Sequence, residues 1–189
     1  MEENQMRVMT KPIVAIDVDS VLFPINEEIL IPEWARHGLE VELEDITDFD
    51  YLKCLTKEHK RIAFAQFRRR DLYDGYNITE EIEESLSRMR GLYRVIVVSS
   101  PFAQHAESKW KFCQRAGFDH TDIVLVGDKT LVDCDVLLDD RPSTLAEIGL
   151  LQGLVFDRPW NQQNYLRHHL RATSWASVPR MVDKLTEGL

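Results

Sequence analysis

Short, unbroken apolar runs recur along the chain, and polar residues follow each run closely. The runs occupy residues 13–16, 95–98, 123–126, 136–138 and 154–156. Continuous apolar character of this length is typical of parallel strands that are covered on both faces, whereas strict alternation would indicate a half-exposed sheet. Helical patterns separate most of the runs, so the sequence predicts an α/β fold built on a doubly wound parallel sheet of the Rossmann-like type.

Two of the intervening segments carry clear helix signals. Residues 79–90 repeat apolar positions at helical spacing, and Asn77 stands where an N-cap is expected. Residues 103–116 predict a second helix, which Gly117 should end. From Trp160 to the C-terminus the pattern predicts one or two closing helices.

Residues 23–75 break the alternation of strands and helices. This segment has no strong strand run, but it contains helix-like stretches at residues 27–38 and 56–70. We therefore expect a small helical cap inserted directly after the first strand. In this interpretation residues 1–22 and 76–189 form the core domain.

Composition and charge narrow the function classes. The chain has 189 residues, 44% of them hydrophobic and 29% charged, which is ordinary for one globular domain. Its net charge of −9 opposes sequence-independent binding of nucleic acid, because such binding requires many phosphates to be neutralised. No apolar run approaches the ~18 residues of a membrane span, and the polar first residues lack a signal-peptide pattern. We expect a soluble, cytoplasmic protein that binds neither nucleic acid nor membranes.

Reactive side chains follow the predicted strands. They are Asp17, Asp19, Ser99, Lys129, Asp139 and Asp140. Ligands of open α/β sheets bind at the carboxyl ends of the strands, so residues from distant parts of the chain should converge there. This expected convergence is the main functional inference from the residues themselves.

The chemistry of this set suits phosphoryl transfer. The carboxylate of Asp17 can attack phosphorus and form an acyl phosphate. Asp19 can protonate the departing alcohol and then accept a proton from the hydrolytic water. Ser99 can donate a hydrogen bond to phosphate at the N-terminus of the following helix.

Neighbouring carboxylates repel one another and also repel a phosphate, so the site needs cations. Oxygen atoms from Asp17, from the backbone carbonyl of Asp19 and from either Asp139 or Asp140 would suit Mg²⁺. Lys129 is the second expected cation, placed to neutralise charge that develops on the phosphoryl oxygens.

The order of these motifs resembles the four motifs of the haloacid dehalogenase superfamily. The motifs are Asp17-Val-Asp-Ser-Val21, Val97-Val-Ser-Ser-Pro101, Lys129 and Asp139-Asp140. The resemblance then narrows, because residues 109–110, 128–130, 135–142 and 174–175 are similar to segments of the 5'(3')-deoxyribonucleotidases. It extends over nearly the whole chain from Ile13 and is weakest across the expected cap.

This resemblance implies a Mg²⁺-dependent phosphatase that acts on deoxyribonucleoside monophosphates. It implies the following roles: Asp17 as nucleophile, Asp19 as acid and base, Ser99, Ser100 and Lys129 as phosphate-binding residues, and Asp17, Asp19 and Asp140 as metal ligands. Phe49 and Phe67 fall near positions where the family stacks aromatic rings on the nucleotide. One departure lies beside the nucleophile, where Ser20 replaces the usual glycine.

Three other functions remain open from the residues alone. The chain could be a phosphatase or phosphotransferase of the same superfamily for another small phosphoester, such as a sugar phosphate. A phospho-acceptor signalling module also uses acidic residues and a lysine at strand ends, but in a different order and without a cap. A non-catalytic binding homologue is disfavoured because no chemical residue is missing. The sequence also leaves open whether the chain forms a homodimer.

Overall fold

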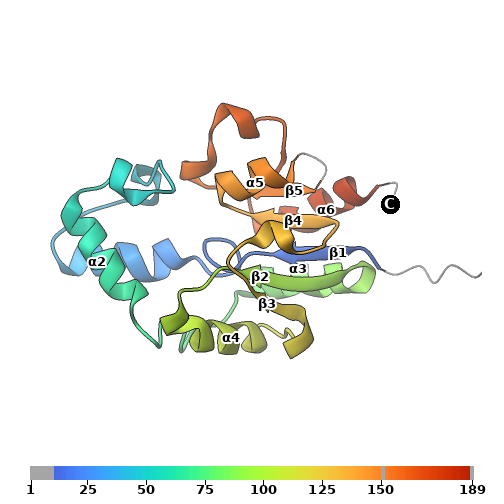
Figure 1. Cartoon of the computed structure of the whole chain (residues 1–189), viewed down its shortest axis with the longest axis horizontal. Helices are drawn as coiled ribbons and strands as arrows, with labels where there is room; N and C mark the ends of the chain where they lie inside the picture. Colours follow the sequence, from blue (N-terminus) through green and yellow to red (C-terminus); the bar gives the residue numbers. More distant parts are fainter. Residues whose placement is uncertain (1–10, 150–151, 188–189) are drawn as a thin grey trace, which may run out of the picture.

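A six-stranded parallel sheet forms the centre of the computed structural model, which describes residues 11–149 and 152–187. The strands are β1 (Ile13–Ile16), β2 (Arg94–Ser99), β3 (Ile123–Leu125), β4 (Val136–Asp139), β5 (Gly153–Phe156) and β6 (Leu170–Ala172). Their order in the sheet is β3-β2-β1-β4-β5-β6, with every neighbouring pair parallel (Figure 1). The doubly wound α/β fold predicted from the sequence is therefore confirmed. The strand order changes direction between β1 and β4, where folds of this kind bind their ligands.

Helices cover both faces of the sheet. They are α3 (Glu80–Leu92), α4 (Ala106–Arg115), α5 (Pro142–Ile148) and α6 (Val178–Thr186), whereas α1 (Ile31–Arg36) and α2 (Lys57–Phe67) belong to the 23–75 segment. On β1, Val14 and Ile16 join the large core that includes side chains of α3, α4 and α6, whereas Ala15 joins a second cluster beside α5. Figure 1 shows α5 on one side of the sheet and α3 and α4 on the other. This two-sided burial explains why the strand sequences are continuously apolar.

Two helix boundaries differ from the prediction or refine it. The N-cap of α3 is Thr79 rather than Asn77, because the Thr79 hydroxyl accepts a hydrogen bond from the backbone N–H of Ile82. The segment expected as one helix over 103–116 begins with a 3₁₀ turn before α4. It ends at Gly117 as predicted, where a φ of +78° suits glycine.

The chain after Trp160 is less helical than the sequence predicted. It contains short 3₁₀ turns and the edge strand β6 before the closing helix α6. The strand was missed because its three residues include Arg171, whose guanidinium pairs with Asp157 at 2.6 Å. Within the described residues, no helix is long and apolar enough to cross a membrane.

The 23–75 segment is helical, as its lack of strand runs indicated. A π-helical turn at Asn26–Leu30 leads into α1, and α2 follows after two 3₁₀ turns. Trp34 is buried at its centre, where the indole N–H donates to the carbonyl of His59 at 2.8 Å. Figure 1 places this segment beyond the end of the sheet at which the chain leaves β1. It therefore lies next to the carboxyl ends of the strands.

Candidate active site

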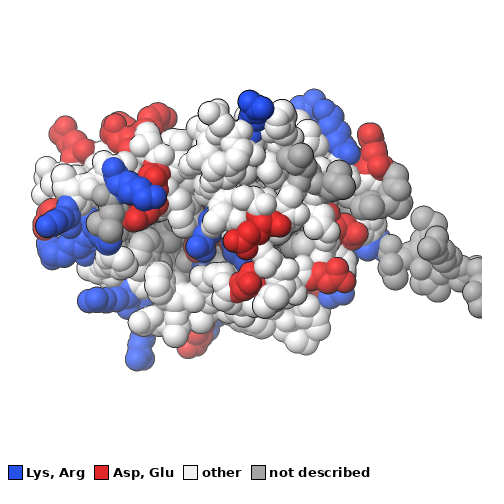
Figure 2. Space-filling model, turned by 45° about the horizontal axis from the view of Figure 1, so that its top comes forward, with Lys and Arg blue, Asp and Glu red and all other residues white. Residues whose placement is uncertain are grey.

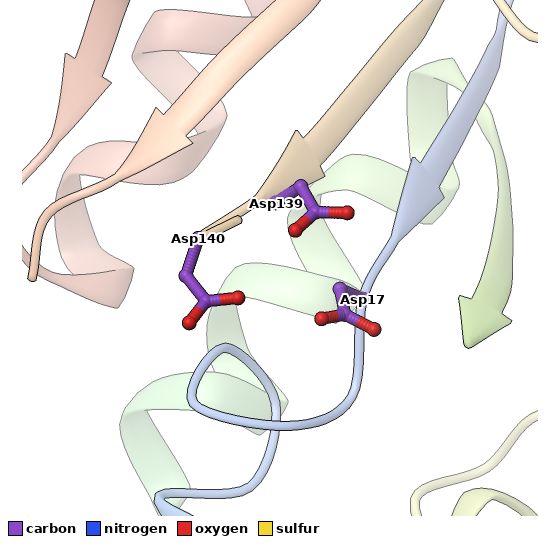
Figure 3. A group of neighbouring side chains, drawn as sticks. All are labelled: Asp17, Asp139 and Asp140. Atoms are coloured by element: carbon purple, nitrogen blue, oxygen red, sulfur yellow. The ribbon is translucent and has the colours of Figure 1, made fainter. Parts of the chain in front are cut away.

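Three carboxylates and one ammonium group meet in the crevice between β1 and β4. Asp17 directly follows β1, Asp139 ends β4 and Asp140 comes next, and Figure 3 shows the three side chains close together. Each offers a carboxylate oxygen within 4.8 Å of the others. The ammonium of Lys129 lies 2.7 Å from Oδ1 of Asp17 and 2.7 Å from Oδ2 of Asp139. The convergence predicted from the strand ends is thus present.

The cluster is buried and contains three carboxyl groups but one ammonium group, so its ionised form carries excess negative charge. Burial raises the pKa of Asp17 to about 6, and the nearby Asp139 carboxylate adds to this effect against the opposing charge of Lys129. Burial and the charges of Asp139 and Asp17 likewise raise the pKa of Asp140 well above its usual value. Both carboxyls would be ionised more easily beside an additional cation.

The hydrogen bonds indicate which oxygens are available to a metal ion. Both oxygens of Asp139 are engaged, one by Lys129 and the other by the backbone N–H of Arg141 at 2.8 Å. Asp140 accepts from the indole N–H of Trp160 through Oδ2 at 2.9 Å, and Asp17 meets Lys129 through Oδ1. Among the described residues, none donates a hydrogen bond to the second oxygen of Asp17 or Asp140. This set of oxygen donors fits a hard divalent cation.

Asp19 belongs to a separate network beside this cluster. Its Oδ2 lies 2.5 Å from the ammonium of Lys109, and its Oδ1 accepts from the phenol of Tyr73 at 2.6 Å. Burial alone would raise the pKa of Asp19, but the Lys109 charge and these hydrogen bonds lower it overall. Asp19 is therefore held as an oriented carboxylate, with partners from α4 and from the end of the 23–75 segment.

The spacing of residues in α4 indicates from the sequence that Lys109 lies on the buried face of the helix. Lys109 precedes Phe112 by three residues and Cys113 by four, so all three lie on the buried face of α4. A fully buried lysine requires a charged or polar partner, and here the partners are Asp19 and Ser99. Tyr73 gave no comparable signal, because only the tertiary fold brings it to Asp19.

The two candidate phosphate-binding serines follow one another at the end of β2. Ser99 is buried and accepts a hydrogen bond from Lys109 at 3.0 Å, which leaves its own hydroxyl hydrogen free to donate. Ser100 donates to the carbonyl of Gly127 at 3.3 Å. The expectation that Ser99 stands at a helix N-terminus is wrong, because the helix α4 begins only at Ala106.

Most of the residues described above line a common cavity of about 430 Å³. Eight of the nine residues that the sequence singled out line it, and Asp139 does not: the eight are Asp17, Asp19, Phe49, Phe67, Ser99, Ser100, Lys129 and Asp140. The cavity lies between the carboxyl ends of the strands and the 23–75 segment, which contributes α2 as one wall. Its volume falls in the usual range of small-molecule sites.

Aromatic rings also line this cavity. Phe49, Phe64 and Phe67 come from the 23–75 segment, and Phe102 comes from the loop after β2. Phe67 and Phe102 stack at a centroid distance of 6.0 Å and an interplanar angle of 29°. The guanidinium of Arg141 lies 5.3 Å from the centroid of Phe49. These two contacts join the 23–75 segment to the core at the cavity.

Ser20 adopts a left-handed conformation in the loop after the nucleophile candidate, with a φ of 60°. Its N–H donates to the carbonyl of Phe23 at 2.7 Å, and its hydroxyl accepts from the side-chain amide of Asn26. Its own carbonyl accepts from Nε of Arg158 at 2.7 Å. The turn therefore has the backbone geometry for which glycine is usually selected.

Comparisons with known proteins agree with one another. A family model described as "5' nucleotidase, deoxy (Pyrimidine), cytosolic type C protein" matches residues 11–186. A 5'(3')-deoxyribonucleotidase of Bacillus subtilis is 23% identical over 176 residues, covering 90% of this chain and 98% of that protein. A putative 5'(3')-deoxyribonucleotidase of Bordetella pertussis is 28% identical over 179 residues, covering 88% of this chain and 94% of that protein.

Solved structures support the fold. A haloacid dehalogenase-like hydrolase of Xanthomonas campestris aligns with a TM-score of 0.56 at 11% identity, covering 94% of this chain and 97% of that one. A hydrolase of the same superfamily from Deinococcus radiodurans, solved with bound phosphate and sodium, aligns with a TM-score of 0.55 at 16% identity, covering 93% and 96%. The resemblance inferred from the motifs is confirmed. The chain has the fold of haloacid dehalogenase-like hydrolases and, because the family model spans most of the chain, it belongs to the deoxyribonucleotidase-like 5' nucleotidase family.

Proposed function

We propose that this protein is a Mg²⁺-dependent phosphomonoesterase that hydrolyses deoxyribonucleoside monophosphates through an aspartyl-phosphate on Asp17. The observation that carries the proposal is the shared cavity, which Asp17, Asp19 and Lys129 line together with aromatic rings of the 23–75 segment. Phosphate chemistry is expected at the charged end, and the flat base of a nucleotide is expected at the aromatic end.

In the first half of the reaction, a carboxylate oxygen of Asp17 attacks phosphorus and the bond from phosphorus to the ester oxygen breaks. Asp19, as the carboxylic acid, donates its proton to the departing nucleoside oxygen. Lys129 and the Ser99 hydroxyl stabilise the negative charge on the phosphoryl oxygens. The products of this half-reaction are the nucleoside and phosphorylated Asp17.

In the second half, Asp19 is a carboxylate and takes a proton from a water molecule. The water oxygen attacks phosphorus, the bond from phosphorus to the Asp17 oxygen breaks, and inorganic phosphate leaves. Asp17 returns as a carboxylate and Asp19 as a carboxylic acid, so the enzyme is ready for the next substrate. The lowered pKa of Asp19 in the substrate-free protein keeps it in the carboxylate form that can accept a proton, while the negative charge of a bound phosphate would raise this pKa toward the carboxylic acid that the first half requires.

The metal ion would be held by side-chain oxygens of Asp17 and Asp140 and by the backbone carbonyl of Asp19. When bound, Mg²⁺ supplies positive charge that offsets repulsion between these carboxylates and the phosphate. Asp140 suits this role better than Asp139, because both oxygens of Asp139 already have partners. The indole of Trp160 fixes the orientation of the Asp140 carboxylate.

In this proposal the 23–75 segment is a cap over the substrate, with residues 1–22 and 76–189 as the core domain. Phe49 and Phe67 would stack on the nucleotide, as their place in the cavity wall allows. A small substrate is favoured over a long nucleic acid. The chain has a net charge of −9, and Figure 2 shows acidic and basic side chains interspersed on the visible face rather than a basic tract.

The test is phosphate release with Mg²⁺ from deoxyribonucleoside and ribonucleoside monophosphates, with sugar phosphates and an aryl phosphate measured alongside. Asp17→Asn provides the blank. We expect kcat/KM to be highest for deoxyribonucleotides and turnover to disappear in the blank and on removal of the metal. Hydrolysis of the aryl phosphate or sugar phosphates without any nucleotide would retain the superfamily chemistry and refute the nucleotide substrate.

A further inference from the structure

Arg158 joins three separate parts of the chain from its place in the turn that follows β5. Its Nε donates to the carbonyl of Ser20 at 2.7 Å, in the loop that follows β1. Its Nη1 lies 2.7 Å from Oε1 of Glu27, in the π-helical turn that precedes α1. The arginine side chain is only 11% exposed, so both contacts are largely shielded from water.

The carbonyl that Arg158 holds belongs to a strained turn. Ser20 is buried and has a φ of 60°, which is unfavourable for a residue with a Cβ atom. Such a conformation persists where surrounding groups hold it in place, and a buried carbonyl also needs a hydrogen-bond donor. Arg158 supplies that donor from a position 138 residues later in the chain.

This turn determines the direction of the backbone carbonyl of Asp19. That carbonyl and the N–H of Ser20 belong to one planar peptide, and the N–H donates to the carbonyl of Phe23 at 2.7 Å. The next peptide joins Ser20 to Val21, and its carbonyl is the one that Arg158 holds. Two adjacent peptides are therefore fixed, and the first of them carries a proposed metal ligand.

The turn that carries Arg158 is anchored beside Asp140, the proposed metal ligand that follows β4. The Asp140 carboxylate accepts from the indole of Trp160 at 2.9 Å, and its backbone carbonyl accepts from the side-chain amide of Asn161 at 3.0 Å. Asn161 Oδ1 in turn accepts from the backbone N–H of Arg158 at 3.1 Å. The guanidinium lies 6.0 Å from the centroid of the Trp160 ring. Arg158 thus links the Asp140 loop to the Ser20 loop.

Arg158 acts on protein groups rather than on substrate. Neither Arg158 nor Glu27 lines the cavity. Among the described residues, the second carboxylate oxygen of Glu27 has no hydrogen-bond partner, so the Arg158 contact is the one that balances this partly buried charge. The ion pair keeps the guanidinium where its Nε reaches Ser20.

We propose that Arg158 is a positioning residue for the reaction: it fixes the Asp19 peptide relative to the Asp140 carboxylate and thereby sets how tightly the two bind Mg²⁺. The proposal rests on the function given above and identifies a residue outside the cavity on which its metal site depends. It adds no contact between the protein and the substrate.

The experiment measures Mg²⁺ binding to the substrate-free protein by isothermal titration calorimetry, for the wild type, Arg158→Met and Arg90→Met. Arg90 provides the matched control, because its guanidinium also lies over an aromatic ring, at 4.7 Å from the centroid of Phe118. It also donates to backbone carbonyls, those of Ala116 and Gly117, and it is outside the cavity lining.

Two further variants separate the contacts of the guanidinium. Glu27→Gln retains an acceptor for Nη1 and leaves Nε to hold Ser20. Arg158→Lys retains the positive charge beside Glu27 but lacks the planar fork of donors, and it keeps the test decisive should Arg158→Met fail to fold. For every variant, kcat and KM are measured at saturating Mg²⁺ on a deoxyribonucleotide and on an aryl phosphate.

We expect Arg158→Met to raise the dissociation constant for Mg²⁺ about tenfold, as is typical when an outer partner of a metal site is lost. Arg158→Lys should raise it by a similar factor, whereas Glu27→Gln and Arg90→Met should remain close to the wild type. In the Arg158 variants kcat should fall on both substrates, while KM stays near the wild-type value because Arg158 touches neither substrate.

An unchanged Mg²⁺ affinity in whichever Arg158 variants fold would overturn the proposal. Equal losses in Arg158→Met and Arg90→Met would also overturn it, because they would indicate a general loosening of the protein. A change confined to KM for the deoxyribonucleotide would overturn it in favour of an effect on the cap. The wild type tests the proposed function separately, since hydrolysis of the aryl phosphate without any nucleotide would refute the nucleotidase function and leave the comparison of variants intact.

Discussion

The ammonium of Lys109 lies 2.5 Å from Oδ2 of Asp19, in a pair whose lysine side chain is fully buried while that of the aspartate is 34% exposed. The lysine has a second acceptor in Ser99, so its position is fixed from within the core. Of the two residues, Asp19 lines the cavity and Lys109 does not. The core therefore orients the proposed acid and base through a residue that itself has no exposure to substrate.

Lys109→Met should change the pH dependence of both stability and catalysis. In the wild type the pKa of Asp19 is lowered, so its contribution to stability is present above about pH 4 and is lost as the pH falls through the folded-state pKa. Without the lysine, only the Tyr73 hydrogen bond and the nearby His105 oppose the effect of burial, so the pKa should rise and stability should instead fall as the pH rises. Urea unfolding between pH 3 and pH 7 measures this difference.

The same variant should lose more than tenfold in kcat on a deoxyribonucleotide and less on an aryl phosphate, whose leaving group needs little protonation. Tyr73→Phe is the matched control for the other oxygen of Asp19, since it removes one hydrogen bond but no charge. Parallel pH profiles of stability in the wild type and Lys109→Met would contradict this account of the pair.

Asp17→Asn should abolish turnover and stabilise the metal-free protein at neutral pH. The pKa of Asp17 is raised to about 6, so the folded state binds the proton more tightly than the unfolded state. Stability of the metal-free wild type should therefore fall between about pH 4 and pH 6, by up to about 3 kcal/mol from this group. The asparagine variant should lack that decline.

Mg²⁺ provides the complementary measurement. Because the metal requires ionised ligands, its addition should raise the Tm of the wild type more at pH 7 than at pH 5. The asparagine variant should show a much smaller rise at both pH values. If Mg²⁺ raised the Tm of both proteins equally, Asp17 would not be a metal ligand.

The sheet could be predicted from sequence because its central strands are buried on both faces. The five apolar runs correspond to β1, β2, β3, β4 and β5. The edge strand β6 was missed because its central residue is Arg171, which pairs with Asp157, whereas the other edge strand, β3, is apolar throughout. Local patterns report burial, so an edge strand with a charged centre gives little signal.

The candidate site was predictable to the extent that its residues follow strands. The pairing of β1 with β4 brings Asp17 next to Asp139 and Asp140. Because each of these residues follows an apolar run, the sequence predicted that they converge at the carboxyl ends of the strands. Of the two partners of Asp19, Tyr73 was not predictable in the same way. Tyr73 reaches it only because the 23–75 segment returns to the core at that point, which is a tertiary relationship that no local period records.

Two substitutions of Ser20 test whether the backbone is strained beside the proposed nucleophile, Asp17. The φ of 60° at Ser20 is unfavourable for a residue with a Cβ atom, while the Ser20 hydroxyl accepts a hydrogen bond from Asn26. Ser20→Ala loses the hydrogen bond and keeps the strain, whereas Ser20→Gly loses the hydrogen bond and relieves the strain. We expect the glycine variant to be more stable than the alanine variant by about 1 kcal/mol in urea unfolding. Equal stability of the two would show that the turn relaxes without cost.

Trp160→Phe should weaken metal binding without changing the metal ligands themselves. The indole N–H of Trp160 donates to Oδ2 of Asp140, and its loss frees the carboxylate to rotate. Removal of such an outer partner typically lowers metal affinity about tenfold, so the Mg²⁺ concentration for half-maximal activity should rise by that factor. The kcat at saturating Mg²⁺ should change much less. Trp175→Phe is the control, because it also removes a buried indole hydrogen bond, here to the carbonyl of Val21. If both variants raised the Mg²⁺ requirement equally, the effect would come from general loosening of the core rather than from Asp140.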